Sequence, residues 1–280
     1  MFNATFRLLV AAALTATLTT ACGDKDKDAA TGLLADAQAQ FEARQFNSAL
    51  ATLDTLDARY PAQVDIRRDA MHLRPKVIEA ASLAELASTD SLIAVLTISG
   101  DSLRSTLTYV PDSFEGYYTS SRISSQKPAD APGLYARMSP EGVFTLISSA
   151  KKGTESTAVT LSAAGAEAST AHVACDGERN DRSRGVEIIT FMPAECDTIG
   201  HFALIHKGQP LKVSFIGSKT ATQPLSTDQA EALAEVWSAS RILGSLRMAQ
   251  MRKTHLERTL DIARSQMART YRDDPTPAAE

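Results

Sequence analysis

The stretch that decides the fold lies near the C-terminus, at residues 225–271: LSTDQAEALAEVWSASRILGSLRMAQMRKTHLERTLDIARSQMARTY. It begins with a capping-box pattern, in which the Ser226 hydroxyl accepts from the third helical amide and the Gln229 side chain reaches back. Apolar side chains then recur every three or four positions, at Leu233, Val236, Trp237, Leu243, Leu246, Leu256, Leu260, Ala263 and Met267. This spacing predicts one long helix over 225–272, with an apolar seam for a partner helix as in a coiled coil.

Residues 77–111 are the expected partner helix. Their apolar residues follow one helical stripe, at Leu83, Leu86, Ile93, Leu96, Leu103, Leu107 and Val110. A break near Gly100 stays open, because glycine costs about 1 kcal/mol inside a helix. We expect the two helices to form an antiparallel pair, a stalk that carries the residues between them.

The intervening residues, 112–217, change to short runs separated by turn signals. The runs are Leu134–Met138, Val143–Ile147, Ala158–Leu161, Gly185–Phe191, Phe202–Ile205 and Leu211–Ile216. Ser139-Pro140-Glu141-Gly142 is typical of a hairpin turn. Regularly spaced strands of this kind indicate a small antiparallel β sandwich or barrel, which makes the overall class α+β.

Residues 31–76 predict a helical hairpin. Apolar residues recur at helical spacing, with small Ala37 and Ala49 where two helices would approach closely, and Tyr60-Pro61 ends the second helix. These features, with Phe41, resemble one tetratricopeptide repeat. Because a stable array needs about three such repeats, we interpret the hairpin as a structural cap; a protein-binding scaffold is the alternative.

The N-terminus carries an export signal. Residues 1–21 contain Arg7, an apolar run too short to span a bilayer, and small residues before Cys22. The Leu18–Cys22 segment resembles the lipid-attachment site of bacterial lipoproteins, although Thr19 stands where leucine is usual. The resemblance implies cleavage before Cys22 and acylation, by palmitate for example, which would anchor the chain stably in a membrane. Ordinary signal cleavage after Ala21 is the alternative.

Residues 22–30 are polar and charged, and predict a flexible tether between the lipid and the folded part. Gly23 follows the cysteine where some Gram-negative lipoproteins carry the aspartate that retains them in the inner membrane, so we expect the outer membrane. Which face the protein occupies, periplasmic or cell-surface, stays open. Residues 273–280 are expected to form a disordered tail.

Cys175 and Cys196 remain once Cys22 is set aside, and an even pair in an exported chain suggests a disulfide. Two buried thiols are the alternative. A zinc site with His172 and His201 is disfavoured, because strand positions three apart point to opposite faces.

Two arginine-rich features are candidate anion contacts. The loop between the cysteines carries Arg179, Arg182 and Arg184. The last helix carries Arg241, Arg247, Arg252, Lys253, Arg258, Arg264, Arg269 and Arg272. For that helix we favour a solvated face, neutralised by Glu79, Glu85, Asp90 and Asp101 on the paired helix.

Catalytic and cofactor motifs are weak. Ser148-Ser149-Ala150-Lys151 has S-x-x-K spacing, but the other motifs of penicillin-recognising enzymes do not follow. Gly217-Ser218-Lys219-Thr220 lacks the glycine frame of a phosphate-binding loop and reads as a polar turn. We therefore expect no catalytic residues, no metal and no cofactor.

Composition describes an ordinary globular protein: 280 residues, 44% hydrophobic, 22% charged, with a net charge of −4. Neither a nucleic-acid binder nor a disordered chain is indicated. The order of segments, with the phrase Val213–Thr220 before the last helix, resembles uncharacterised envelope lipoproteins of Gram-negative anaerobes. We expect a non-enzymatic, membrane-anchored lipoprotein whose β module binds a ligand or an unknown envelope protein or glycan. An envelope hydrolase or carbohydrate-active enzyme is the alternative.

Overall fold

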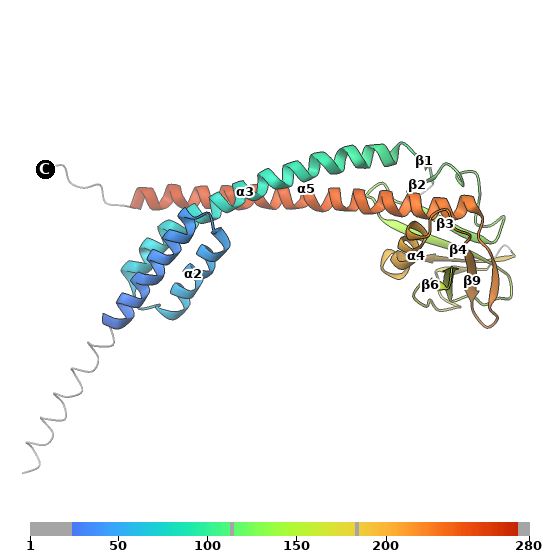
Figure 1. The fold of residues 1–280 in the computed structure, drawn as a ribbon, viewed down its shortest axis with the longest axis horizontal. Coiled ribbons are helices and arrows are strands. Elements are labelled where there is room, and N and C mark those ends of the chain that lie inside the picture. Colours follow the sequence, from blue (N-terminus) through green and yellow to red (C-terminus); the bar gives the residue numbers. More distant parts are fainter. Residues whose placement is uncertain (1–23, 113–114, 183–184, 274–280) are drawn as a thin grey trace, which may run out of the picture. The chain divides into compact units, whose positions relative to one another are not determined.

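The computed structural model describes residues 24–112, 115–182 and 185–273 and has the α+β fold that the sequence predicts (Figure 1). It divides into two compact units. The helical unit holds the described residues up to Asp90 together with those from Arg252 onward. The β unit holds Ser91–Met251. The predicted signal peptide, Cys22 and the tail from residue 274 lie outside the described residues.

The predicted helical hairpin forms the core of the helical unit. Its helices are residues 24–42 and α2, Phe46–Arg59, and the start of α3, Val64–Arg104, packs against them. The shared core comprises Ala30, Ala37, Ala49, Leu53, Leu56, Ile66, Ala70, Leu73 and Val77. The tether expected over 22–30 is wrong for residues 24–30, which are helical because Ala30 is fully buried in this core.

Ion pairs align α3 on α2. The Arg74 guanidinium donates to Asp54 at 2.6 Å and to Asp57 at 2.9 Å, and Arg67 donates to the other oxygen of Asp57 at 3.0 Å. One half-buried arginine therefore bridges two carboxylates on the neighbouring helix, a stronger arrangement than an isolated surface pair.

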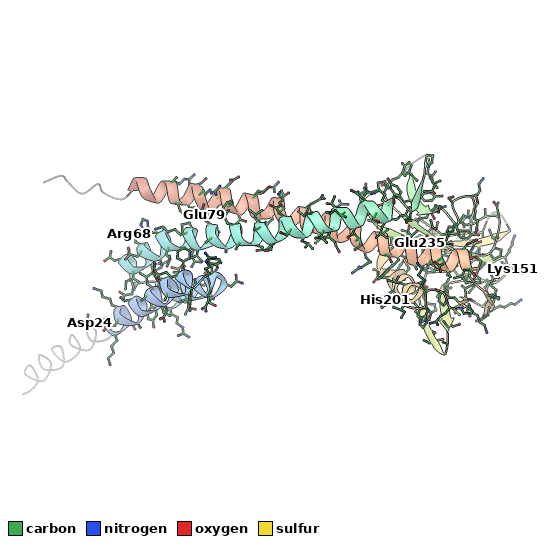
Figure 2. All side chains as sticks on the ribbon, turned by 45° about the horizontal axis from the view of Figure 1, so that its top comes forward. Asp24, Arg68, Glu79, Lys151, His201 and Glu235 are labelled. Atoms are coloured by element: carbon green, nitrogen blue, oxygen red, sulfur yellow. The ribbon has the colours of Figure 1, made fainter. Side chains whose placement is uncertain are left out.

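Within the helical unit, α3 runs antiparallel to α5, Thr227–Asp273. The pairs are Glu79–Arg264 at 2.8 Å, Glu85–Arg252 at 2.6 Å and Asp90–Lys253 at 2.8 Å. Figure 2 labels Glu79 on α3. These pairs confirm that acidic residues of the paired helix neutralise part of the arginine-rich face. Asp101 pairs instead with Arg104 on its own helix, at 3.6 Å.

An 18-residue window of α3 has a mean hydropathy of 1.4, so by length and composition alone this helix is apolar enough to cross a membrane. Its apolar character comes partly from exposed side chains such as Val95 and Ile98. The same helix carries Glu79, Glu85 and Asp90, each paired with a cation of α5. Because charges inside a membrane span are costly, we interpret α3 as the packed partner of α5.

Helix α3 is not broken near Gly100 and is shifted from its predicted bounds, 77–111. It begins at Val64 and ends at Arg104, and Leu107–Val110 forms strand β1 instead. Gly100 lies against α5, where an added Cβ would be 2.9 Å from Leu243 Cδ2. The glycine therefore allows close helix packing within the β unit.

The β unit contains two antiparallel sheets among its described residues. The six-stranded sheet has the order β1 (Leu107–Val110), β2 (Tyr117–Ser120), β3 (Gly133–Met138), β4 (Phe144–Lys151), β8 (Val186–Phe191), β7 (Asn180–Asp181). The four-stranded sheet has the order β10 (Ala221–Pro224), β9 (Lys212–Ile216), β5 (Ala158–Ala163), β6 (Ala166–Ser169). One core joins both sheets to the first turns of α5, through Leu146, Phe191, Val159, Phe215, Leu233 and Val236.

The strand predicted at Phe202–Ile205 is wrong. This segment belongs to helix α4, Pro193–Ile205. Pro193 stands at a first-turn position that suits its fixed φ, and the Glu195 carboxylate accepts from the Met192 amide at 2.8 Å, as in a capping box. The buried positions Cys196, Ile199, Gly200 and Ala203 also have helical spacing.

The predicted hairpin turn is confirmed, and of the predicted capping box the Ser226 half is confirmed. Ser139–Gly142 joins β3 to β4, and Gly142 takes a φ of +86°. At the start of α5, the Gln229 amide donates to the Ser226 hydroxyl at 3.2 Å. The Gln229 side chain lies against Gly133, where an added Cβ would be 2.3 Å from Gln229 Nε2.

Two helical glycines are expected to respond oppositely to alanine. At Gly200 an added Cβ would lie 2.1 Å from Trp237 Cδ1, so Gly200→Ala should destabilise the β unit by about 1–3 kcal/mol through overpacking. Nothing lies within 4 Å of the corresponding point at Gly244, so Gly244→Ala should stabilise it by up to about 1 kcal/mol through helix propensity. Urea denaturation of both variants measures the difference, and equal effects would contradict the packing.

Candidate functional site

A groove of about 1000 Å³ lies on the β unit, on the face of the six-stranded sheet opposite the main core. Every strand of that sheet lines it: Val110 of β1, Tyr117 of β2, Arg137 of β3, Ile147 of β4, Asp181 of β7, and Ile188 and Thr190 of β8. Loop residues complete the wall: Pro111, Asp112, Lys127, Pro128, Ala129, Glu178, Arg179 and Met192. The groove thus combines a small apolar floor with charged ends.

Arg137 is the central cation of this groove. Its guanidinium carbon lies 4.0 Å from the centroid of the Tyr117 ring, within the range of a cation–π contact. The side chain is half-buried, and within the described part of the chain it forms no hydrogen bond or ion pair. Its N–H donors therefore have no acceptor in the described part of the chain.

The other charged side chains of the groove differ in whether they have partners. Arg179 donates to both carboxylate oxygens of Glu195, at 2.7 and 2.9 Å. Asp112 and Asp181 each have an interaction within the protein. Lys127 and Glu178 are exposed and have no side-chain partner among residues 24–112, 115–182 and 185–273.

Two arginines of the loop predicted as an anion contact have partners within the protein. Arg179 is held by Glu195, as above, and this pair raises the pKa of Arg179 and lowers that of Glu195. Arg182 donates to the backbone carbonyl and the thiol of Cys175. Arg184 lies outside the described residues. The described arginines are thus used to hold the loop rather than to present a cationic cluster.

The predicted disulfide between Cys175 and Cys196 is absent, and both are free thiols. Cys196 lies in the first turn of α4, fully buried in the main core, where its thiol donates to the Met192 carbonyl at 3.2 Å. Burial raises the pKa of Cys196 to about 12. Cys175 lies in the loop before β7 beside Arg182. The alternative of unpaired thiols is therefore the one that the structure supports.

The histidines weighed for a metal site have other neighbours. His172 Nδ1 lies 3.2 Å from the Thr157 hydroxyl, and the His201 ring lies 5.5 Å from the Trp237 ring. In the described ranges, no group of three or more His, Cys, Asp or Glu side chains is arranged to hold a metal.

The S-x-x-K segment does not assemble a nucleophile and a base. Ser148 and Lys151 are both on β4, where positions three apart point to opposite faces. Ser148 is fully buried in the interior, and Lys151 is exposed at the strand end (Figure 2). Gly217–Thr220 is the turn between β9 and β10, as the polar-turn interpretation expects.

Glu187 is a buried carboxylate that the sequence analysis missed. It is 2% exposed and accepts three backbone N–H groups, from Gly153 at 2.8 Å, Glu155 at 3.1 Å and Ser156 at 2.8 Å. Burial alone would raise the pKa of Glu187, but these bonds and the nearby Arg182 charge outweigh it and lower the pKa. Its signal in the sequence was an acidic residue at an inward position of an alternating strand.

Comparisons with protein-family models, curated proteins and solved structures gave no match.

The groove itself had only a faint sequence signal. Tyr117 belongs to the single adjacent tyrosine pair of the sequence, Tyr117-Tyr118, whereas Lys127 and Arg137 have no distinguishing pattern. They come together because β2, β3 and the connecting loop are neighbours in the sheet.

Glu187→Gln should destabilise the protein at neutral pH. The amide loses the charge and one of the acceptor oxygens, which should cost roughly 1–3 kcal/mol. Since the folded-state pKa is lowered, this stabilisation is present above the unfolded-state pKa of about 4.3 and is lost as pH falls through the folded-state pKa. Urea denaturation at pH 7 and pH 3 measures it: the difference from the unmodified protein should shrink at pH 3. Glu178→Gln, at an exposed carboxylate, is the control, and a difference that is unchanged at pH 3 would contradict the assignment.

Proposed function

We propose that this protein is a lipid-anchored, non-enzymatic binding protein whose β unit captures a ligand in the groove of the six-stranded sheet. The observation that carries the proposal is the free, stacked guanidinium of Arg137 in a groove to which all six strands contribute. The N–H donors of Arg137 have no acceptor in the described chain and are not among its buried unsatisfied atoms, so they stay open to water, which an anionic ligand can replace.

The described lining of the groove contains carboxylates, cations and the Thr190 hydroxyl, but neither histidine, serine nor cysteine. A hydrolase with a serine or cysteine nucleophile therefore draws no support from this site. The carbohydrate-active alternative stays open, because Asp112, Glu178 and Asp181 are of the residue type that glycosidases use.

The scaffold alternative draws little support from the helical unit. Leu33 and Phe41, which would contact a partner, pack against the core of their own hairpin. The ligand-binding reading of the β unit is accordingly preferred over capture of a protein by the hairpin.

Attachment at Cys22 belongs to the same proposal and rests on the sequence. An acylated Cys22 with an outer-membrane address would hold the β unit in the envelope. In a Gram-negative host fed labelled palmitate, the intact chain should incorporate label and fractionate with outer membranes. Cys22→Ala should do neither, whereas Cys175→Ala, the matched control, should do both. Label that persists in Cys22→Ala would contradict the anchor.

Blocking the groove should abolish ligand binding. Thr190→Arg places a long side chain in the groove, and Thr222→Arg places the same side chain at an exposed position of β10. Ile methyl NMR spectra would be recorded with a defined set of short peptides, amino sugars and fatty acids. At least one compound should shift the Ile147 and Ile188 signals in the unmodified protein and in Thr222→Arg, but not in Thr190→Arg. Chemical conversion of a bound compound would favour the enzyme alternative, and the absence of any shift would contradict the proposal.

A further inference from the structure

The unpaired positive and negative side chains of the groove lie at different strands. Lys127 and Arg137, both cations, belong to β3 and the loop that precedes it. Glu178, an anion, stands in the segment leading into β7. Asp112, Asp181 and Arg179 already have partners. Over the stretch of the groove from β3 to β7, the β3 end therefore offers free cations and the β7 end a free carboxylate.

The N–H donors of Arg137 are arranged to bind a carboxylate. Its guanidinium carbon lies 4.0 Å from the centroid of the Tyr117 ring, so the ring covers one side of the group and leaves the N–H edge as the binding surface. That edge presents two parallel N–H donors, whose spacing matches the two oxygens of a carboxylate. Lys127, on the same wall, would add a second positive charge.

The sheet sets the separation of the two ends. Between β3 and β7 lie β4 and β8, so the ends are three strand spacings apart. At about 4.8 Å per strand this is roughly 14 Å. An extended chain covers about 3.3–3.6 Å per residue, so roughly four residues span it. The floor between the ends is formed by Ile147, Ile188 and Thr190.

Other ligand classes fit less well. The Tyr117 face that could stack on a sugar is covered by Arg137. A long alkyl chain would gain little from a floor with two isoleucines and charges at both ends. A short peptide meets all three features, because it can carry a carboxylate, an apolar side chain and a basic group along one extended chain.

We infer that the groove binds an extended peptide of about four residues. Its C-terminal or side-chain carboxylate contacts Arg137 and Lys127, an apolar side chain covers Ile147 and Ile188, and a basic group lies near Glu178. This inference rests on the proposed function of the groove and names its ligand class.

The test uses the mature chain with Cys22→Ser and the N-acetylated tetrapeptide Lys-Ala-Leu-Leu. Peptides with a free and with an amidated C-terminus are titrated while the Arg137 Nε–H and Ile methyl signals are followed by NMR. The free acid should bind at least tenfold more tightly than the amide, which is about 1.4 kcal/mol. Arg137→Gln should remove this preference, so that both peptides bind equally weakly. Arg247→Gln, an exposed arginine of α5 outside the groove, should leave it intact.

The acidic end is tested by charge reversal. Replacing the peptide lysine by glutamate should weaken binding about two- to fivefold, as expected for an exposed pair. Glu178→Lys should invert that order, so that the glutamate peptide binds better than the lysine peptide.

The outcomes separate the two proposals. If the peptides shift Ile147 and Ile188 but the free acid has no advantage, the carboxylate contact is overturned while the binding groove stands. If no peptide binds and an amino sugar or fatty acid does, the peptide class is overturned and the groove again stands. If no compound of any class shifts these signals, both proposals fail.

Discussion

The β unit depends on the burial of the first turns of α5. Leu233, Val236 and Trp237 pack in the main core between the two sheets, and Ala232 packs with Tyr135 and Ile147 from the other face of the six-stranded sheet. A helix that is apolar on nearly every side must be buried on nearly every side. The close approach of Gly200 to Trp237 then seats α4 on α5. Both sheets are organised around this helix.

The groove lies where the side chains that cover one face of the six-stranded sheet end. The face of the six-stranded sheet opposite the main core is covered in part by the cluster of Ile123, Tyr135, Ile188 and Ala232. The stretch of that face from Tyr117 to Asp181 lines the groove, and Ile147 and Ile188 belong to both the cluster and the groove floor. A sheet face that is partly covered offers rigid positions for side chains and access for a ligand, which is the setting usual for binding sites.

Charge pairing distinguishes structural cations from candidate binding cations. The arginine-rich character of α5 draws attention in the sequence, yet Arg252 and Arg264 are paired with acidic residues of α3. Arg179 and Arg182, in the loop that looked most like an anion contact, are likewise held by partners within the β unit. Arg137 has no other arginine near it in the sequence, and within the described residues its guanidinium contacts the Tyr117 ring but forms no ion pair. The number of arginines in a segment therefore does not predict which arginine can bind an anion. What matters is whether acidic or carbonyl acceptors within the protein already bind the guanidinium.

The amino-acid sequence by itself determined the α+β class, the helical hairpin, the long α5 and most central strands, because each follows from local periodicity and turn residues such as Ser139–Gly142. The strand predicted at Phe202–Ile205 was wrong, because a short apolar run is compatible with either a strand or a helix. Pro193 and Glu195 are the residues that indicate the start of a helix here. Only the tertiary structure decided that Cys175 and Cys196 stay apart, that Glu187 receives three backbone amides, and that Tyr117, Lys127 and Arg137 share a groove with Glu178. These relations join residues far apart in the chain, and strand order and helix burial fix them rather than any local pattern.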